Sequence, residues 1–127
     1  MKLLLDTTVL IDVLRKRGKR RKLLEELVSM GHELTTSVIC VAEVYASLRP
    51  GEEIRAQLFL RDLSCYPVTD RIAVRAGVIK CERSRTGKTL SMTDMFIAST
   101  ALEYNFSFMT DNLKDFPIEE LKIYPLP

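Results

Sequence analysis

Four short stretches of this chain, each apolar or rich in Ser and Thr, run directly into an acidic residue. These stretches are Leu3-Leu4-Leu5-Asp6, Val41-Ala42-Glu43, Ser91-Met92-Thr93-Asp94 and Phe108-Met109-Thr110-Asp111. An acid beside apolar sequence is drawn toward the core, where an unpaired carboxylate is costly unless it finds a cation. Four such acids spread along the chain therefore predict one shared metal site.

The segments around these acids alternate between predicted strands and predicted helices. The apolar runs predict strands over 2–6, 33–36, 65–68, 106–110 and 121–124. Helical periodicity and capping residues predict helices from Thr7 or Thr8 to Leu14, over 37–48, over 52–63, from Thr69 or Asp70 to the loop at 84–88, and over 91–104. Gly18 breaks the pattern, and a further helix with Leu23, Leu24, Leu27 and Val28 is predicted to stop at Gly31. This alternation is typical of an α/β fold, a parallel sheet covered by helices.

In such sheets, ligands bind outside the carboxyl ends of the strands. Asp6 and Asp111 fall at predicted strand ends, Glu43 lies inside a helix, and Asp94 lies in the first turn of a helix that Ser91 opens. Clustered carboxylates suit a hard cation such as Mg²⁺. Two such ions can hold the attacking and leaving oxygens of a phosphodiester, so the acids are predicted to be ligands.

Length and charge limit what this site serves. The 127 residues, 46% of them hydrophobic, predict a single domain over 1–127, because domains commonly run to ~100–150 residues. The net charge is only +2, but setting aside Asp6, Glu43, Asp94, Asp111 and Asp115 leaves 19 bases against 12 acids. A basic surface around an acidic pocket favours a polyanionic substrate.

The cysteine pattern and the opening residues indicate a compartment. Cys40, Cys65 and Cys81 are odd in number, far apart and without a C-x-x-C pair, so neither a disulfide framework nor a thiolate zinc site is predicted. Asp6 interrupts the opening apolar run well before a signal peptide is complete. No segment approaches the ~18 apolar residues of a membrane span. We expect a cytoplasmic protein without a membrane partner.

Two basic segments are candidates for contacts with the phosphates of a polyanion. One is the run Arg15, Lys16, Arg17, Lys19, Arg20, Arg21 and Lys22; the other is Arg83, Arg85 and Lys88. For most members of the first run, a solvated helix junction is the simpler interpretation.

Order, spacing and total length together give a specific resemblance over essentially all 127 residues. The markers are Leu5-Asp6-Thr7-Thr8-Val9-Leu10-Ile11-Asp12, Ala42-Glu43-Val44, Leu90-Ser91-Met92-Thr93-Asp94-Met95-Phe96-Ile97-Ala98, and Thr110-Asp111-Asn112 with Asp115-Phe116. The chain resembles PIN-domain ribonucleases, in particular the VapC toxins of VapBC toxin–antitoxin systems. This resemblance implies a Rossmann-like three-layer α/β/α sandwich with a mostly parallel central sheet, and an endoribonuclease that uses Mg²⁺ or Mn²⁺.

Carried to this chain, the family's roles make Asp6 and Asp94 the principal metal ligands and Glu43 a further ligand or water holder. The resemblance also implies that the Thr8 hydroxyl orients Asp6 or a bound water. The family commonly has Thr-x-Asp near the end, whereas this chain has Asn112 there. The fourth position therefore falls to Asp111, to Asp115 or to the amide of Asn112, and the number of metals stays open.

The resemblance also implies partners besides an RNA substrate. A cognate VapB-type antitoxin is expected to cover the acidic pocket, with an Arg or Lys reaching the carboxylates. A homodimer is expected as well. The helix predicted over 52–63 carries more apolar residues than one buried stripe needs, and its candidates for that interface are Ile54, Leu58, Phe59 and Leu63.

Three alternatives stay open at this point. Each acid has a simpler interpretation as a helix-terminal, turn or surface carboxylate. A receiver-type phosphoacceptor domain also gathers acids at the carboxyl end of a parallel sheet, although this chain lacks the adjacent acids and the late Lys such a domain needs. A PIN fold with a weakened site could bind RNA or protein without cleavage, and Asn112 favours this.

Overall fold

The computed structural model describes residues 1–15 and 18–127, so Lys16 and Arg17 of the basic run lie outside the described residues. The strands are β1 (Lys2–Leu5), β2 (Glu33–Ser37), β3 (Ser64–Tyr66), β4 (Ser107–Met109) and β5 (Lys122–Ile123). The helices are α1 (Thr7–Leu14), α2 (Gly18–Ser29), α3 (Val38–Ala46), α4 (Glu53–Leu60), α5 (Asp70–Ser84), α6 (Met92–Tyr104) and the short 3₁₀ helix η1 (Leu113–Asp115).

The described strands form one sheet in the order β3-β2-β1-β4-β5, and every pairing in it is parallel. The first strand of the chain is therefore the centre of the sheet, with β2 on one side and β4 on the other. Receiver domains have the order 2-1-3-4-5, so the strand order argues against the receiver alternative.

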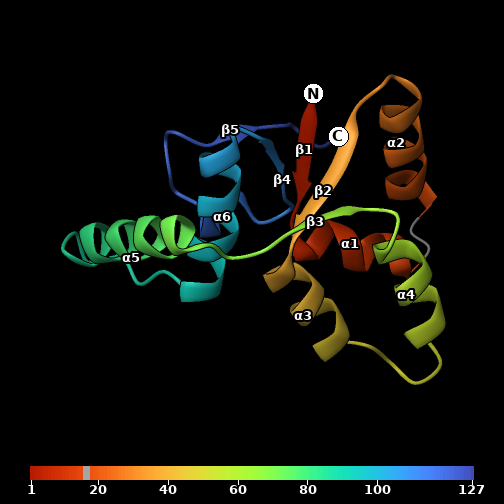
Figure 1. Ribbon diagram of the computed structural model, residues 1–127, viewed down its shortest axis with the longest axis horizontal. Coiled ribbons are helices and arrows are strands. Elements are labelled where there is room, and N and C mark those ends of the chain that lie inside the picture. The colour runs from red at the N-terminus through yellow and green to blue at the C-terminus, as the bar shows by residue number, and fades with distance from the viewer. Residues whose placement is uncertain (16–17) are drawn as a thin grey trace.

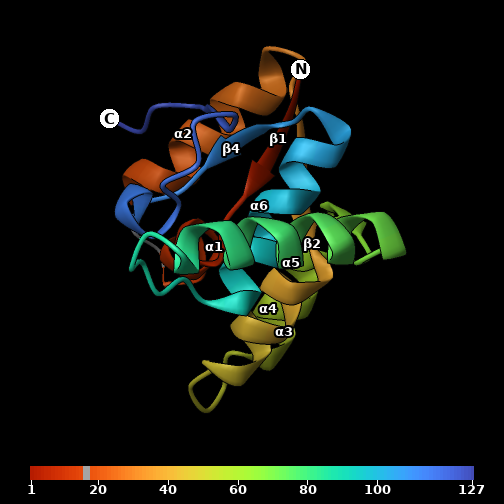
Figure 2. The same ribbon diagram turned by 90° about the vertical axis from the view of Figure 1, so that its left-hand side faces the viewer.

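Helices cover both faces of the sheet, as predicted for an α/β/α sandwich. Figure 1 shows α5 and α6 on one side of the strands and α1, α2 and α4 on the other. In the turned view of Figure 2, α5 crosses in front of α6, with the strands behind them. Helix α3 begins directly after β2 and lies at the carboxyl end of the sheet (Figure 1).

The centre of the sheet is buried on both faces, which is typical of parallel strands. Leu3, Leu4 and Leu5 have no exposed surface, so both side-chain directions of β1 face a helical layer. On the neighbouring strand β2, the buried hydroxyls of Thr35 and Thr36 donate to the carbonyl oxygens of Leu3 and Leu5 at 2.9 and 3.1 Å. These bonds satisfy polar groups that would otherwise weaken the core.

Several predicted boundaries differ from the structure, each by a few residues. The helices predicted over 37–48 and 52–63 end earlier, at Ala46 and Leu60, and a turn at 61–62 carries Leu63 back into the core. The predicted strand over 65–68 spans Ser64–Tyr66, since the chain leaves the sheet at Pro67. Helix η1 was not predicted.

The predicted caps are correct for three helices and wrong for one. Ser37, Thr69 and Ser91 accept backbone hydrogen bonds at the starts of α3, α5 and α6. The residue before α1 is Asp6 rather than Thr7 or Thr8, and its side chain makes no capping bond.

In the described residues, no helix is both long enough and apolar enough to cross a membrane. Cys40, Cys65 and Cys81 are free thiols in the structure, Cys40 buried and the other two exposed. On α4, Ile54 and Leu58 are exposed, whereas Leu63, also predicted for a dimer interface, is buried. A hollow of about 800 Å³ lies between α2, α4 and β2, and Leu58, Phe59 and Leu63 are among the residues that line it.

Candidate active site at the carboxyl edge of the sheet

Asp6 is the structural centre of the site. It follows the central strand β1 directly and is only 4% exposed. Its backbone N–H donates to the carbonyl oxygen of Met109 at 2.9 Å, which extends the pairing of β1 with β4 by one residue. The carboxylate is therefore fixed at the point where two parallel strands end, the position where ligands of such sheets bind.

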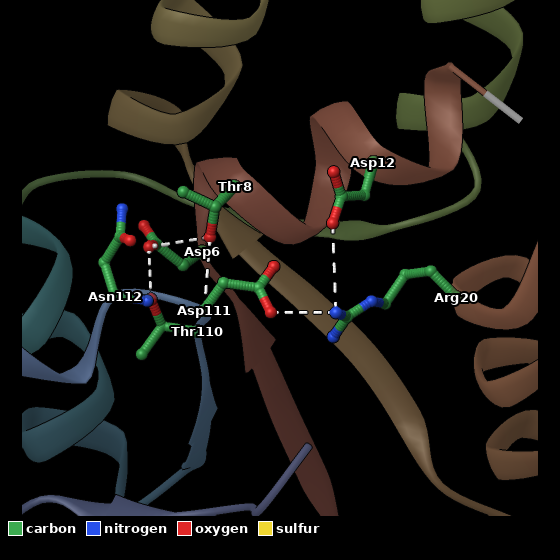
Figure 3. A network of polar contacts seen from close by, with 7 residues as sticks. All are labelled: Asp6, Thr8, Asp12, Arg20, Thr110, Asp111 and Asn112. Carbon is green, nitrogen blue, oxygen red and sulfur yellow. Dashed lines mark hydrogen bonds and ion pairs between the residues drawn. The ribbon is translucent and has the colours of Figure 1, made fainter. Parts of the chain in front are cut away.

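Two threonine hydroxyls donate to the same oxygen of Asp6. Thr110 Oγ1 is 2.7 Å from Asp6 Oδ2, and Thr8 Oγ1 is 3.3 Å from it (Figure 3). Burial raises the pKa of Asp6, while the bonds from Thr110 and Thr8 act in the opposite direction. The resemblance implied that Thr8 orients Asp6 or a bound water, and the bond to Asp6 agrees with the first of these. The shorter bond from Thr110 was missed, although Thr110 stands in the Thr-Asp-Asn marker.

Glu43 reaches the site from the middle of α3. Ser37 caps this helix by accepting from the backbone N–H of Ile39 at 3.0 Å, which sets the direction of α3 away from the sheet edge. Thr7 Oγ1 then donates to Glu43 Oε1 at 2.6 Å. Thr7 and Thr8, expected to cap α1, instead hold the two carboxylates of Glu43 and Asp6.

Asp94 lies in the first turn of α6, where its backbone N–H donates to Ser91 Oγ at 3.2 Å. Burial, and after it the negative charges of Asp6, Asp115 and Glu43, raise the pKa of Asp94 to about 6. Asp94 therefore lies within electrostatic reach of three carboxylates that other segments of the chain carry, those of Asp6, Glu43 and Asp115.

The structure separates the two late acids that the sequence left as alternatives. Asp115, at the end of η1, belongs to the group whose charge acts on Asp94. Asp111 instead forms an ion pair with Arg20, whose Nη2 is 2.8 Å from Asp111 Oδ1, and Figure 3 shows its carboxylate directed toward Arg20. Asp111 was proposed as a metal ligand, but its carboxylate is already neutralised by a cation of the chain.

The donor set fits a hard divalent cation that keeps part of its water shell. In the described part of the chain, none of the four carboxylates (Asp6, Glu43, Asp94 and Asp115) is ion-paired with Lys or Arg. No group of three or more His, Cys, Asp or Glu among the described residues stands close enough to hold a metal ion alone. Mg²⁺ is usually bound by one or two carboxylates plus waters and substrate phosphates, which this arrangement can supply.

Two members of the basic run, Arg15 and Arg20, contact other segments of the fold. Arg15 donates to the carbonyl oxygen of Ser47 at 3.1 Å and lies 3.6 Å from Glu52, so it ties α1 to the segment before α4. Arg20 is engaged with Asp111 as described. Among the described residues of the two basic segments, Arg83 is half-buried. The exposed members, which remain candidates for phosphate contacts, are Lys19, Arg21, Lys22, Arg85 and Lys88.

The raised pKa of Asp94 predicts a pH dependence of stability in metal-free protein. An acid whose folded pKa lies above its unfolded value binds more protons when folded, so stability falls as pH rises from about 4 through about 6 and then levels off. We expect the wild type to lose more free energy of unfolding than Asp94→Asn between pH 4 and pH 7. Urea unfolding with a chelator present measures this; parallel curves for the two proteins would contradict it.

An acidic cluster beyond a parallel 3-2-1-4-5 sheet defines a class of protein. Residues 3–117 match the model of the PIN domain family, and the chain belongs to that family. Within it, the chain is similar to ribonucleases named VapC: it is 31% identical to ribonuclease VapC10 of Mycobacterium tuberculosis, across 94% of this chain and 90% of that protein.

Solved structures agree with this assignment. VapBC2 from Rickettsia felis, bound to a DNA fragment from its promoter, includes a chain that superposes with a TM-score of 0.86 at 22% identity and 98% coverage of both chains. A toxin–antitoxin complex from Klebsiella pneumoniae gives a TM-score of 0.77 at 26% identity, with 94% of both chains covered. The first likeness shows the fold, and together they confirm the predicted α/β architecture. The family match also removes the receiver-type alternative.

Proposed function

We propose that this chain is a divalent-metal-dependent endoribonuclease of the VapC type, the toxin of a toxin–antitoxin pair. The observation that carries the proposal is the convergence of Asp6, Glu43, Asp94 and Asp115, without a basic partner among the described residues, in a chain related to ribonuclease VapC10. Mutual repulsion and burial make these carboxylates a poor arrangement without a cation and a good one with it.

In this proposal, Asp6 and Asp94 hold Mg²⁺ or Mn²⁺, with Glu43 and Asp115 as further ligands or water holders. When bound, the metal supplies Lewis-acid stabilisation and a water of lowered pKa. The residues of the chain position the donors: Thr110 and Thr8 fix Asp6, Thr7 fixes Glu43, and Ser91 fixes the start of α6. Exposed Arg85 and Lys88, in the loop before α6, then contact phosphates.

The test is incubation of purified protein with total RNA in Mg²⁺, in Mn²⁺ and in chelator, followed by mapping of the new RNA ends. We expect discrete ends that depend on the metal and that Asp6→Asn abolishes. Ends that persist in the Asp6→Asn protein at the wild-type level would assign the cleavage to a contaminant and defeat the proposal.

A binding module that does not cleave RNA is the second candidate. Two observations favour it: Asn112 stands where relatives of this family commonly carry an acid, and no three described acids form a compact metal group. Retention of labelled RNA on a filter without new ends, in all metals, is the result expected for this candidate. Cleavage would exclude it.

The partners of the VapC-type proposal are a VapB-type antitoxin and a second copy of the chain. The neighbouring structures are themselves VapBC or toxin–antitoxin complexes, which supports the first. An antitoxin side chain of Arg or Lys would meet four carboxylates that form no ion pair within the described residues. Exposed Ile54 and Leu58 on α4 support a self-contact, and light scattering of the purified protein measures it.

A further inference from the structure

Arg20 of α2 lies between carboxylates from two other segments of the fold. Its Nη2 is 2.8 Å from Asp111 Oδ1, after β4, and 3.8 Å from Asp12 Oδ2, on α1 (Figure 3). The Arg20 side chain is only 16% exposed. An ion pair with one largely buried member is screened less by water and salt than a surface pair, so this contact is expected to restrain both carboxylates.

A continuous set of hydrogen bonds leads from Asp111 to Asp6. The backbone N–H of Asp111 donates to Thr8 Oγ1 at 3.3 Å, and Thr8 Oγ1 donates to Asp6 Oδ2 at 3.3 Å. Thr110, the residue before Asp111, donates directly to Asp6 Oδ2 at 2.7 Å. Asp111 is therefore linked to both hydroxyls that orient the central carboxylate, to Thr8 by a hydrogen bond and to Thr110 by the peptide chain.

Residues 110–115 also contain a hydrogen bond of their own. Thr110 Oγ1, while it donates to Asp6, accepts from the backbone N–H of Asn112 at 3.0 Å. One turn further on, Asp115 completes η1 and adds its charge to the acidic group. Residues 110–115 thus carry two side chains of the site, and Asp111 is their ion-paired attachment to the helical layer of α1 and α2.

We propose that Arg20 is a positioning residue of the active site: through Asp111 it holds the segment 110–115 so that Thr110 and Thr8 stay hydrogen-bonded to Asp6. This inference rests on the proposed function, because it concerns the same carboxylates. It also gives Asp111 a role other than metal ligation. Since Arg20 is largely buried and paired with two acids, it does not serve as a contact for RNA phosphate.

The test compares variants by two readouts, amide hydrogen exchange of residues 110–115 and steady-state RNA cleavage. Arg20→Met keeps the length of the side chain and removes its charge. We expect about tenfold faster exchange in this segment, because local opening is no longer opposed by the ion pair. We expect kcat to fall by about 10- to 100-fold with KM nearly unchanged, as for loss of a partner that orients a ligand.

Companion variants separate positioning from general damage. Asp111→Asn should reproduce both effects, and the double variant Arg20→Met with Asp111→Asn should add little, because one interaction is removed in each case. Arg20→Lys keeps the charge and should restore much of kcat. Arg71→Met is the control for loss of an arginine ion pair of the same length outside the site: its Nε lies 2.8 Å from Glu103 Oε1 between α5 and α6, and its side chain is 84% exposed. This variant should leave both readouts unchanged.

Specific results would overturn the inference. Wild-type exchange of residues 110–115 in Asp111→Asn or in Arg20→Met would show that the ion pair does not hold the segment. A raised KM with unchanged kcat would make Arg20 an RNA contact instead. If Arg20→Met does not fold, Arg20→Lys and Asp111→Asn decide. If the wild type cleaves no RNA in any metal, the proposed function fails, while the exchange data still decide whether Arg20 holds the segment.

Discussion

Asp6→Asn and Asp94→Asn are each expected to lower the rate of RNA cleavage by about 10³-fold, because metal stabilisation is worth several kcal/mol and each 1.36 kcal/mol is tenfold in rate. An amide keeps the size of the carboxylate and one oxygen, but it loses the charge that a divalent cation requires. The measurement is kcat on a defined RNA fragment in Mn²⁺. Asp115→Asn should lower kcat more than Asp62→Asn does, because Asp62 is an exposed acid far from the site.

The loss of activity should not come from unfolding. Burial raises the pKa of Asp6, so its charge opposes folding at neutral pH when no metal is present. We therefore expect the metal-free Asp6→Asn protein to melt at the same temperature as the wild type or higher. Calorimetric titration with Mn²⁺ supplies the second readout: wild-type heats in both Asn variants would contradict the assignment of Asp6 and Asp94 as ligands.

Phe108→Ala is expected to reduce the free energy of unfolding by about 3–5 kcal/mol, the range for removing a large buried aromatic side chain. Phe108 has no exposed surface in β4 and meets Phe116 edge to face, with ring centres 4.8 Å apart. Urea unfolding of the metal-free protein measures the change. Leu113→Ala, at a side chain that is 51% exposed, should change it by less than about 0.5 kcal/mol.

This pair of rings also connects stability to the site. Phe116 follows Asp115 directly, so packing against Phe108 anchors the end of η1 beneath the acidic cluster. A small effect of Phe108→Ala, below about 1 kcal/mol, would mean that the cavity collapses at little cost and that the anchor is weak. Retained packing of Phe116 in that variant would be visible as unchanged exchange of its backbone amide.

Much of the fold can be predicted from the sequence, because the local signals for strands and helix caps agree with the structure. The run Leu3–Leu5 reads as a strand buried on both faces, and Ser37, Thr69 and Ser91 cap the helices that they were expected to cap. The end of α4 was not predicted correctly. Leu63 continues the apolar pattern of the helix, yet it reaches the core from a turn, so periodicity alone extended the helix too far.

The site could be predicted only in part, because local sequence signals do not show long-range contacts. Asp6 and Asp94 stand beside strand and cap signals that place them at the sheet edge. Asp111 has a strand signal too, but it shares one short segment with Asp115, and no local signal tells which of the two faces the other acids. Asp111 differs from Asp115 because it pairs with Arg20, which lies 91 residues away along the chain. In the sequence, Arg20 is one residue of a plain basic run. A contact of that span depends on the crossover of the whole chain and leaves no local pattern.

The position of β1 in the middle of the sheet sets an order of assembly. Its neighbour β4 is the fourth strand in the chain, and the bond from the Asp6 amide to Met109 forms only when that late strand has arrived. A fragment that stops before Ser107 lacks Thr110, Asp115 and one whole flank of the central strand. During synthesis, most of the polypeptide must therefore emerge before the acidic site can form, and a prematurely released fragment would lack that site.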